Sequence, residues 1–376
     1  MKTIKFLMSL TLSVFSLVAL ASGLGFEIPN EVLSLLPNTG TGVTFAMAGI
    51  SVTQVQSELT AYANKSKEAV KAMVYQKSQV AKYMKTVTKV DGDFPVVHSV
   101  TDRVVQGFLS VWNAKGTTSF KPNILKAYKQ KVNFPIVPSD VNKTWLAYLY
   151  QEGLKQADMP ISKYIIEREL GPAVERDVEY LMGNGAYDAN DLTTFGKSMD
   201  GLKALLAAGV ASSTKPMYKV PLASITASNI LTEVEKFEDN IPSEVAGMVD
   251  KIYMSRKNAT RYRRAARAAY GTTVNMGPSA VDYTADGDRQ IIGLTCLNGS
   301  DVIFATPDEN FLKLIDVIDA PPAITDVQSA DYTVKIFMEF TLGIGFAINQ
   351  MVICSVTSGS GSGLTTDNDV YYSSGS

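Results

Sequence analysis

Side chains that could carry out acid–base or covalent chemistry are scarce in this chain of 376 residues. His98 is its one histidine, so a histidine-based triad or proton shuttle would need that single residue. It lies in a largely apolar segment, FPVVHSV, which favours a structural histidine over a catalytic one. Cys296 and Cys354 are far apart and match no zinc or redox spacing, so we expect both to pack as small apolar side chains.

Motifs of the common enzyme classes are also missing from the sequence. It contains no GxSxG, HExxH, GxxxxGKS/T or paired CxxC pattern. Chemistry by carboxylates alone, such as glycoside hydrolysis, would need two acids facing a cleft, and no acidic residue stands out from solvated helix faces. The sequence therefore predicts no enzyme activity, no catalytic residue, no metal ligand, no cofactor and no small-molecule substrate.

Composition indicates a globular chain with no general affinity for nucleic acid. Hydrophobic residues make up 46% and charged residues 19%, which is typical of folded domains, and the length suggests two or three of them. Lys and Arg number 35 against 37 Asp and Glu, a formal charge of -2. Any contact with nucleic acid would therefore be local.

The first residues are typical of a secretory signal peptide. Lys2 and Lys5 precede an uncharged run, 6–21, that ends in Ala-Leu-Ala, and the run is short for a membrane span. The alternative is an apolar arm that packs against its own protein. Residues 23–46 are expected to be a linker.

The element that would position everything else is a long helix at 160–183. Apolar residues three or four apart predict one buried face, and roughly 24 residues at about 1.5 Å each give a rod of about 36 Å. Gly171-Pro172 predicts a kink or a break into two helices. We expect Gly183 and Gly185 to supply the positive φ that closes it. Such a beam indicates an architectural role.

Other elements follow from periodicity and turn residues. Ser51 and Gln54 predict a capped helix whose apolar stripe continues through Val87. Further helices are expected at 141–156, with Trp145, Leu146, Leu149 and Leu154 inward, and at 198–209, 228–240 and 257–270. Strands are expected at 91–100, 133–139 (an edge strand or arm), 248–254, 290–297 and 301–306, with a chain break at 116–122 and two strands within 332–354. Asn298-Gly299 predicts a tight hairpin between 290–297 and 301–306. The class is a mixed α+β fold.

The order of these pieces resembles the major capsid proteins of tailed double-stranded DNA phages, which have the Hong Kong 97-like fold. Four segments carry the resemblance: 161–188 (ISKYIIERELGPAVERDVEYLMGNGAYD), 194–209, 249–264 (VDKIYMSRKNATRYRR) and 291–314. Residues 133–153 are similar to capsid proteins of crAss-like and related Bacteroidetes phages.

The resemblance implies a domain plan. Residues 1–46 would be the apolar N-terminal segment and linker, and 47–140 the N-terminal helix, extended arm and loop. A peripheral domain with the spine helix would cover 141–220, an axial domain 221–330, peripheral return strands 331–356 and a Ser/Gly-rich tail 357–376.

The resemblance also implies a function. A non-enzymatic subunit would assemble with itself into pentamers and hexamers around packaged double-stranded DNA contacted non-specifically. It would meet portal and other head proteins, need no membrane, and belong to a virion assembled in the bacterial host cytoplasm. An export signal conflicts with that location. Met47 could be the true start, residues 1–46 could be an assembly element, or the protein could be exported. The alternatives are therefore an exported surface or periplasmic binding protein, or an encapsulin-type compartment subunit.

Candidate inter-subunit contacts are basic and aromatic. A cluster on and before one predicted helix could pair with carboxylates of another subunit or with DNA phosphates, and the alternative is a solvated helix face. Trp112 and Trp145 could anchor subunit contacts or pack in the core. The basic candidates are Arg256, Arg261, Arg263, Arg264 and Arg267, together with Lys257.

Overall fold

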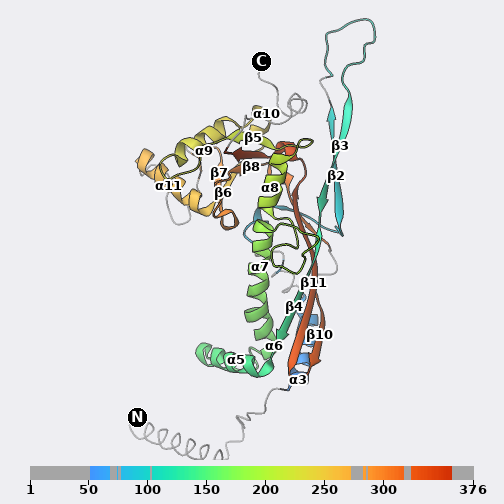
Figure 1. The fold of residues 1–376 in the computed structure, drawn as a ribbon, viewed down its shortest axis with the longest axis vertical. Helices are drawn as coiled ribbons and strands as arrows, with labels where there is room; N and C mark the ends of the chain where they lie inside the picture. Colours follow the sequence, from blue (N-terminus) through green and yellow to red (C-terminus); the bar gives the residue numbers. More distant parts are fainter. Residues whose placement is uncertain are drawn as a thin grey trace, which may run out of the picture. The chain divides into compact units, whose positions relative to one another are not determined.

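The computed structural model describes residues 51–67, 74, 78–101, 104–271, 283–284, 287–316 and 323–357 (Figure 1). Two compact units divide the chain, Met1–Gly49 and Ile50–Ser376, and the described residues all belong to the second. The expectations for residues 1–46, and for 358–376 of the tail, therefore lie outside the described residues.

A five-stranded sheet is built around one long strand. This strand, β11 (Thr333–Phe346), pairs antiparallel with β10 (Ala323–Ala330), β4 (Tyr128–Ile136) and β9 (Phe311–Ile315). β1 (Lys85–Val87) adds to β9 in parallel. Because β4 pairs with β11 and with no other described strand, the predicted edge strand at 133–139 is confirmed as far as Ile136.

The long helix is continuous and contains a wide turn. It consists of α6 (Ile161–Tyr164), a π-helical segment (Ile165–Leu170) and α7 (Gly171–Asn184). Gly171 N–H donates to Ile166 O, five residues back, so the wide turn comes directly before Pro172, which has no N–H to donate. The helix predicted at 160–183 is confirmed, and the alternative of a break into two helices is wrong.

Two more helices, α3 (Val52–Lys65) and α5 (Pro138–Glu152), pack against the α6 end of this helix. Ser51 Oγ accepts a hydrogen bond from Gln54 N at 3.1 Å, which confirms the predicted helix start. The expectation that the helix runs through Val87 is wrong. Lys85–Val87 instead pairs with Leu312–Leu314, so sheet pairing overrides the helical periodicity there.

A second five-stranded sheet has the order β5 (Tyr218–Pro221), β12 (Ile353–Val356), β8 (Phe304–Ala305), β6 (Lys251–Ser255) and β7 (Gln290–Leu294). The hairpin predicted at Asn298-Gly299 is wrong, because β6 lies between β7 and β8. Gly299 does have the positive φ of a tight turn, at 83°. The turn therefore forms but joins strands that are not neighbours.

Helices α9 (Ile230–Asp239) and α11 (Arg256–Tyr270) pack on each other, and α11 also packs on β6 and β7 (Figure 1). Alternate residues of each strand point to opposite faces, so the sheet separates two hydrophobic cores. In β6, Ile252 and Met254 belong to the core under these helices, here called the second core. Tyr253 between them belongs to the core around the long helix, here called the first core. The mixed α+β class is confirmed.

Two strands stand apart from both sheets. β2 (Asp93–Thr101) and β3 (Thr118–Lys126) form a two-stranded antiparallel ribbon, drawn in blue-green in Figure 1. The strand predicted at 91–100 is confirmed. The chain break predicted at 116–122 is wrong from Thr118 onward, since Pro122 lies within β3 opposite Val97. Proline is tolerated in β3 because an edge strand leaves one row of N–H groups unpaired.

Candidate inter-subunit surfaces

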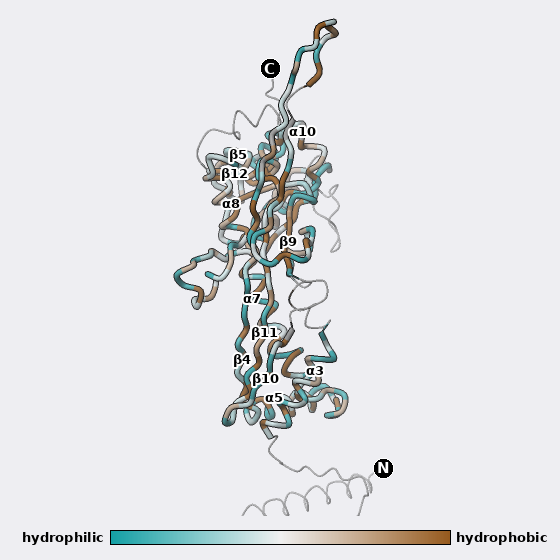
Figure 2. The backbone as a smooth tube through the Cα atoms, turned by 90° about the vertical axis from the view of Figure 1, so that its right-hand side faces the viewer, coloured by the Kyte–Doolittle hydropathy of each residue, from teal (hydrophilic) through white to brown (hydrophobic). Residues whose placement is uncertain are grey.

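The loop that joins β2 to β3, residues 104–117 and here called the arm loop, exposes a run of large apolar side chains. Each of them is at least half exposed: Val104 54%, Val105 84%, Phe108 96%, Leu109 69%, Val111 75% and Trp112 87%. The loop is the part at the top of Figure 2, where its backbone carries hydrophobic colouring. Its own hydrogen bonds close it, from Gln106 Nε2 to Asn113 O and from Lys115 Nζ to Val105 O.

The apolar surface continues onto the ribbon. Val97, Phe120 and Ile124 are 59%, 71% and 57% exposed. Monomeric proteins seldom expose contiguous apolar patches, and such patches mark binding surfaces. The ribbon and arm loop therefore have the character of an interface.

The base of the ribbon is fixed to the rest of the fold. Asn123 Nδ2 donates to Phe346 O at 2.8 Å, and Lys215 Nζ donates to Pro122 O. Leu125 is buried and lies against Gly345, where a Cβ would stand 2.7 Å from a Leu125 methyl. The exposed apolar residues are thus held on a braced support.

The two tryptophans have opposite environments. Trp145 is 5% exposed, and its indole N–H donates to Met159 O at 2.9 Å, so the core interpretation is confirmed for this residue. For Trp112 that interpretation is wrong. Two further residues expected to point inward, Leu146 on α5 and Leu154 just after it, are 43% and 38% exposed.

The predicted basic cluster lies on α11, on a different element from Trp112. Ser255 Oγ caps the helix by accepting from Asn258 N at 3.2 Å. Arg261 is half-buried and bound within the subunit, where it donates to Asn258 Oδ1 at 3.0 Å and to Ile225 O at 3.4 Å. The other five cations on α11 are exposed, and two of them, Arg263 and Arg267, already interact with other groups of the chain. The remaining three are here called the basic face: Arg256, Lys257 and Arg264.

The glycines at the end of the long helix do not have the predicted conformation. Neither Gly183 nor Gly185 has a positive φ, and Gly185 lies at −57°. They permit close packing instead. A Cβ on Gly183 would stand 2.1 Å from Cys296 Cβ, and one on Gly201 would stand 2.5 Å from Leu181 O. Gly201 N donates to Gly185 O at 2.9 Å, so these two residues close a loop.

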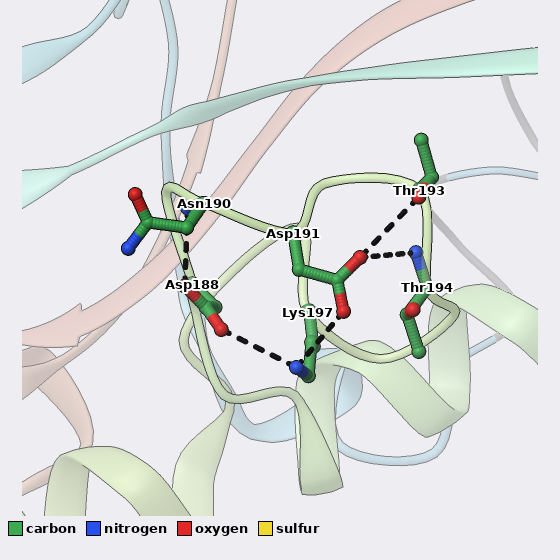
Figure 3. Close-up of polar contacts among 6 residues, drawn as sticks. All are labelled: Asp188, Asn190, Asp191, Thr193, Thr194 and Lys197. Atoms are coloured by element: carbon green, nitrogen blue, oxygen red, sulfur yellow. Dashed lines mark hydrogen bonds and ion pairs between the residues drawn. The ribbon is translucent and has the colours of Figure 1, made fainter.

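This loop, residues 186–200, is internally locked (Figure 3). Lys197 Nζ donates to Asp191 Oδ2 at 2.9 Å and to Asp188 Oδ2 at 3.3 Å. Asp191 Oδ1 accepts from Thr194 N at 3.2 Å. The hydrogen bond from Lys197 is the main reason that the pKa of Asp191 is lowered to about 2, and the same bond raises the pKa of Lys197. Loops with closed ends and internal contacts are frequently functional, and this one exposes Leu192 and Phe195, each by 57%.

The residues that could have carried chemistry do not converge. His98 is half-buried on β2 opposite Lys121. Cys296 and Cys354 are free thiols, both buried as predicted, and burial raises the pKa of each to about 12. Among the described residues there is no group of three or more His, Cys, Asp or Glu side chains that could hold a metal ion. Within the same residues, no helix combines the length and apolar character needed to cross a membrane.

Sequence reasoning missed one polar junction. Glu179 Oε2 accepts hydrogen bonds from Ser78 Oγ at 2.5 Å and from Gln79 N at 2.7 Å, and Gln79 Oε1 accepts from Thr295 Oγ1 at 2.9 Å. The long helix, the segment before β1 and the turn after β7 are therefore tied together at this point. The partners are about 100 or more residues apart in sequence, so no local spacing could have predicted it.

Comparison with known proteins gives matches by structure alone. No family model and no curated protein matches the chain. Similar solved structures include the capsid of Myoviridae phage XM1, at 8% identity, covering 74% of this chain and 90% of that one, with a TM-score of 0.47. The capsid of a native GTA particle is similar at 11% identity, with 74% and 96% covered and a TM-score of 0.47. The satellite phage P4 procapsid is similar at 12% identity, with 83% and 99% covered and a TM-score of 0.47. All three are capsid or procapsid structures.

Proposed function

We propose that this chain is the major capsid subunit of a tailed phage, which assembles with copies of itself into an icosahedral shell. The observation that carries the proposal is the arm loop, whose six large apolar side chains are between 54% and 96% exposed on a braced ribbon. In an isolated subunit this surface is unfavourable, because apolar area stays in water. A neighbouring copy that covers it removes that cost.

Self-assembly fits the rest of the fold. A shell subunit must make different contacts on its different sides, because head-to-tail contacts close into rings around symmetry axes. The continuous helix and the long strand β11 give this chain a stiff frame, and the arm loop gives it an exposed apolar surface that a neighbouring copy can cover. The described residues offer no converging set of catalytic groups that would favour an enzyme.

The finer features are part of the same proposal. Pentamers and hexamers would surround double-stranded DNA contacted non-specifically, and portal and other head proteins would join them. Assembly would take place in the host cytoplasm. The domain boundaries and the inter-subunit roles of Arg256, Arg261, Arg263, Arg264, Arg267 and Trp112 also stay predictions, although Arg261 already has partners within its own subunit.

Expression of the full chain, followed by size-exclusion chromatography and negative-stain microscopy, tests the proposal. We expect closed shells of uniform diameter. A soluble monomer that stays monomeric at high concentration, or one recovered from the periplasm, would refute the proposal and favour an exported binding protein. DNA inside particles purified from the native host separates a capsid from an encapsulin-type compartment.

Mass spectrometry of the subunit in those particles addresses the signal-like first residues. An intact Met1 would exclude Met47 as the true start, and cleavage after Ala21 would favour export.

A further inference from the structure

The surface around the second core carries opposite charges at two separate places. One is the basic face of α11, defined above. The other is a set of three exposed carboxylates, here called the acidic edge: Asp239, Asp250 and Asp288. Asp239 follows Glu238, which pairs with Arg289 at 2.6 Å, and Asp250 O accepts from Gln290 N at 2.8 Å. The acidic edge therefore gathers where β6 and β7 begin.

The basic face and the acidic edge are kept apart by the strand between them. Asp250 directly precedes β6 and Arg256 directly follows it, so the two lie roughly 20 Å apart at about 3.3 Å per residue. Exposed charges separated by more than about 10 Å are largely screened at 0.1 M salt. Arg256 and Asp250 of one copy therefore do not satisfy each other.

Nearby groups of opposite sign are already engaged. Beside the acidic edge, Lys251 is paired with Asp308 and Arg289 with Glu238. Beside the basic face, Asp301 accepts a hydrogen bond from Asn258 Nδ2 at 3.3 Å, and its one negative charge is fewer than the three positive charges of that face. Each surface is thus left with a charge excess that its own engaged neighbours do not remove.

We propose that the basic face of one copy docks on the acidic edge of a second copy. The two surfaces differ, so the contact is head to tail and repeats from copy to copy until a ring closes. Opposite charge across the contact sets its register and rejects wrong pairings. This inference rests on the proposed function and adds to it the two surfaces that meet.

Charge reversal tests the pairing. In the first variant Arg256→Glu and Arg264→Glu reverse the basic face, and in the second Asp250→Lys and Asp288→Lys reverse the acidic edge. We expect each to lower the assembled fraction, measured by sedimentation, at least tenfold at low salt, while the four-fold variant regains the wild-type fraction. Glutamate at position 256 lies in the first turn of α11, where the helix dipole favours it, so misfolding is not the expected cause of a loss.

A mixture of the first and second variants gives a sharper readout. Alternating copies make every contact attractive, but only in rings with an even number of subunits. The mixture should therefore form hexameric rings and no pentameric ones, and closed icosahedral shells should be missing.

Lys143→Glu with Lys155→Glu is the control matched to the first variant, because it makes the same change in net charge at exposed positions on and just after α5. It should assemble as the wild type does. Thermal unfolding of each variant as a subunit verifies that the fold is kept.

Two results would overturn the inference while leaving the proposed function intact. One is assembly at the wild-type level by either charge-reversed variant; if the particles of the first variant then lack DNA, the basic face binds phosphate instead. The other is a folded four-fold variant that stays unassembled. If the wild-type chain forms no shells at all, the proposed function fails and this pairing falls with it.

Discussion

Close packing explains the glycines at and after the end of the long helix better than backbone conformation does. Gly183, Gly185 and Gly201 lie where a Cβ would stand within 2.1–2.5 Å of another atom, and two of those atoms are backbone oxygens. A backbone oxygen cannot move aside as the end of a flexible side chain can. These positions therefore require glycine for space.

Gly201→Ala should lower the free energy of unfolding by about 1–3 kcal/mol, the usual cost of overpacking. Denaturant titration of the subunit measures it. Gly247→Ala is the matched control, since a Cβ there meets no atom within 4 Å and φ is −74°. Equal stability of the two variants would contradict the packing explanation.

The hydroxyl of Tyr253 is a second residue-scale feature. The side chain is fully buried between the rings of Phe304 and Tyr83, and its hydroxyl has no hydrogen-bond partner among the described residues. Burial raises the pKa of this tyrosine.

A buried donor without a partner is costly, so Tyr253→Phe should raise the free energy of unfolding by about 1 kcal/mol. Tyr62→Phe is the comparison, because Tyr62 OH donates to Glu167 Oε1 at 2.6 Å. The free energy of unfolding of that variant should fall by about 1 kcal/mol. Calorimetry of the two variants gives the sign of each change in the free energy of unfolding. A decrease in the Tyr253→Phe variant would show that the Tyr253 hydroxyl has a hydrogen-bond partner.

At the scale of elements, the locked loop 186–200 makes a prediction about pH. The pKa of Asp191 is about 2 in the fold against an ordinary 3.8, so the carboxylate form is stabilised by folding. Its contribution is fully present above about pH 4 and is lost as pH falls toward 2. The pKa of Lys197 is raised, so its contribution to stability is fully present below pH 10.5 and is lost as pH rises above that value.

Asp191→Asn should open this loop at neutral pH without unfolding the subunit. Hydrogen exchange at the amide of Thr194, which donates to Asp191, should become faster, while exchange in α7 stays slow. Asp177→Asn is the control, since that carboxylate lies on the helix outside the loop. Unchanged exchange at Thr194 would show that the lock does not hold the loop.

Helices with strong periodicity could be predicted from the sequence, and pairing between distant strands could not. Helix α9 has Ile230, Val234 and Phe237 on one buried face, and that spacing is visible in the sequence. The partner of β7 could not be read in the same way, because Ile291 pairs with Ile252, some 40 residues earlier. The Asn-Gly turn fixed the local conformation but not which strands became neighbours.

The surfaces were predictable in part for a related reason. The sequence marked the arginines of α11, because charge is visible residue by residue. It could not show that Trp112 is exposed, since an apolar run such as 104–112 reads the same whether its own core or another copy covers it.

At the scale of the whole molecule, the arm loop should matter for assembly and not for folding. Phe108→Ser with Trp112→Ser should change the free energy of unfolding by less than about 0.5 kcal/mol, as exposed substitutions usually do. The same variant should form no shells in negative-stain images. Tyr332→Ser, which removes another side chain that is 83% exposed, should still assemble. If the arm-loop variant forms shells, the arm loop is not needed for assembly.

The sheet of β5, β12, β8, β6 and β7 has one further consequence. Neighbouring residues of a single strand, such as Phe304 and Ala305 of β8 or Ile353 and Cys354 of β12, are buried in different cores. Because the same strands line both cores, neither core can lose its packing without disrupting the packing of the other. Heating the subunit should therefore give one sharp calorimetric peak whose van't Hoff and calorimetric enthalpies agree, as in all-or-none melting. The two cores of a subunit built this way melt together, so copies with only one core melted should not enter a growing particle.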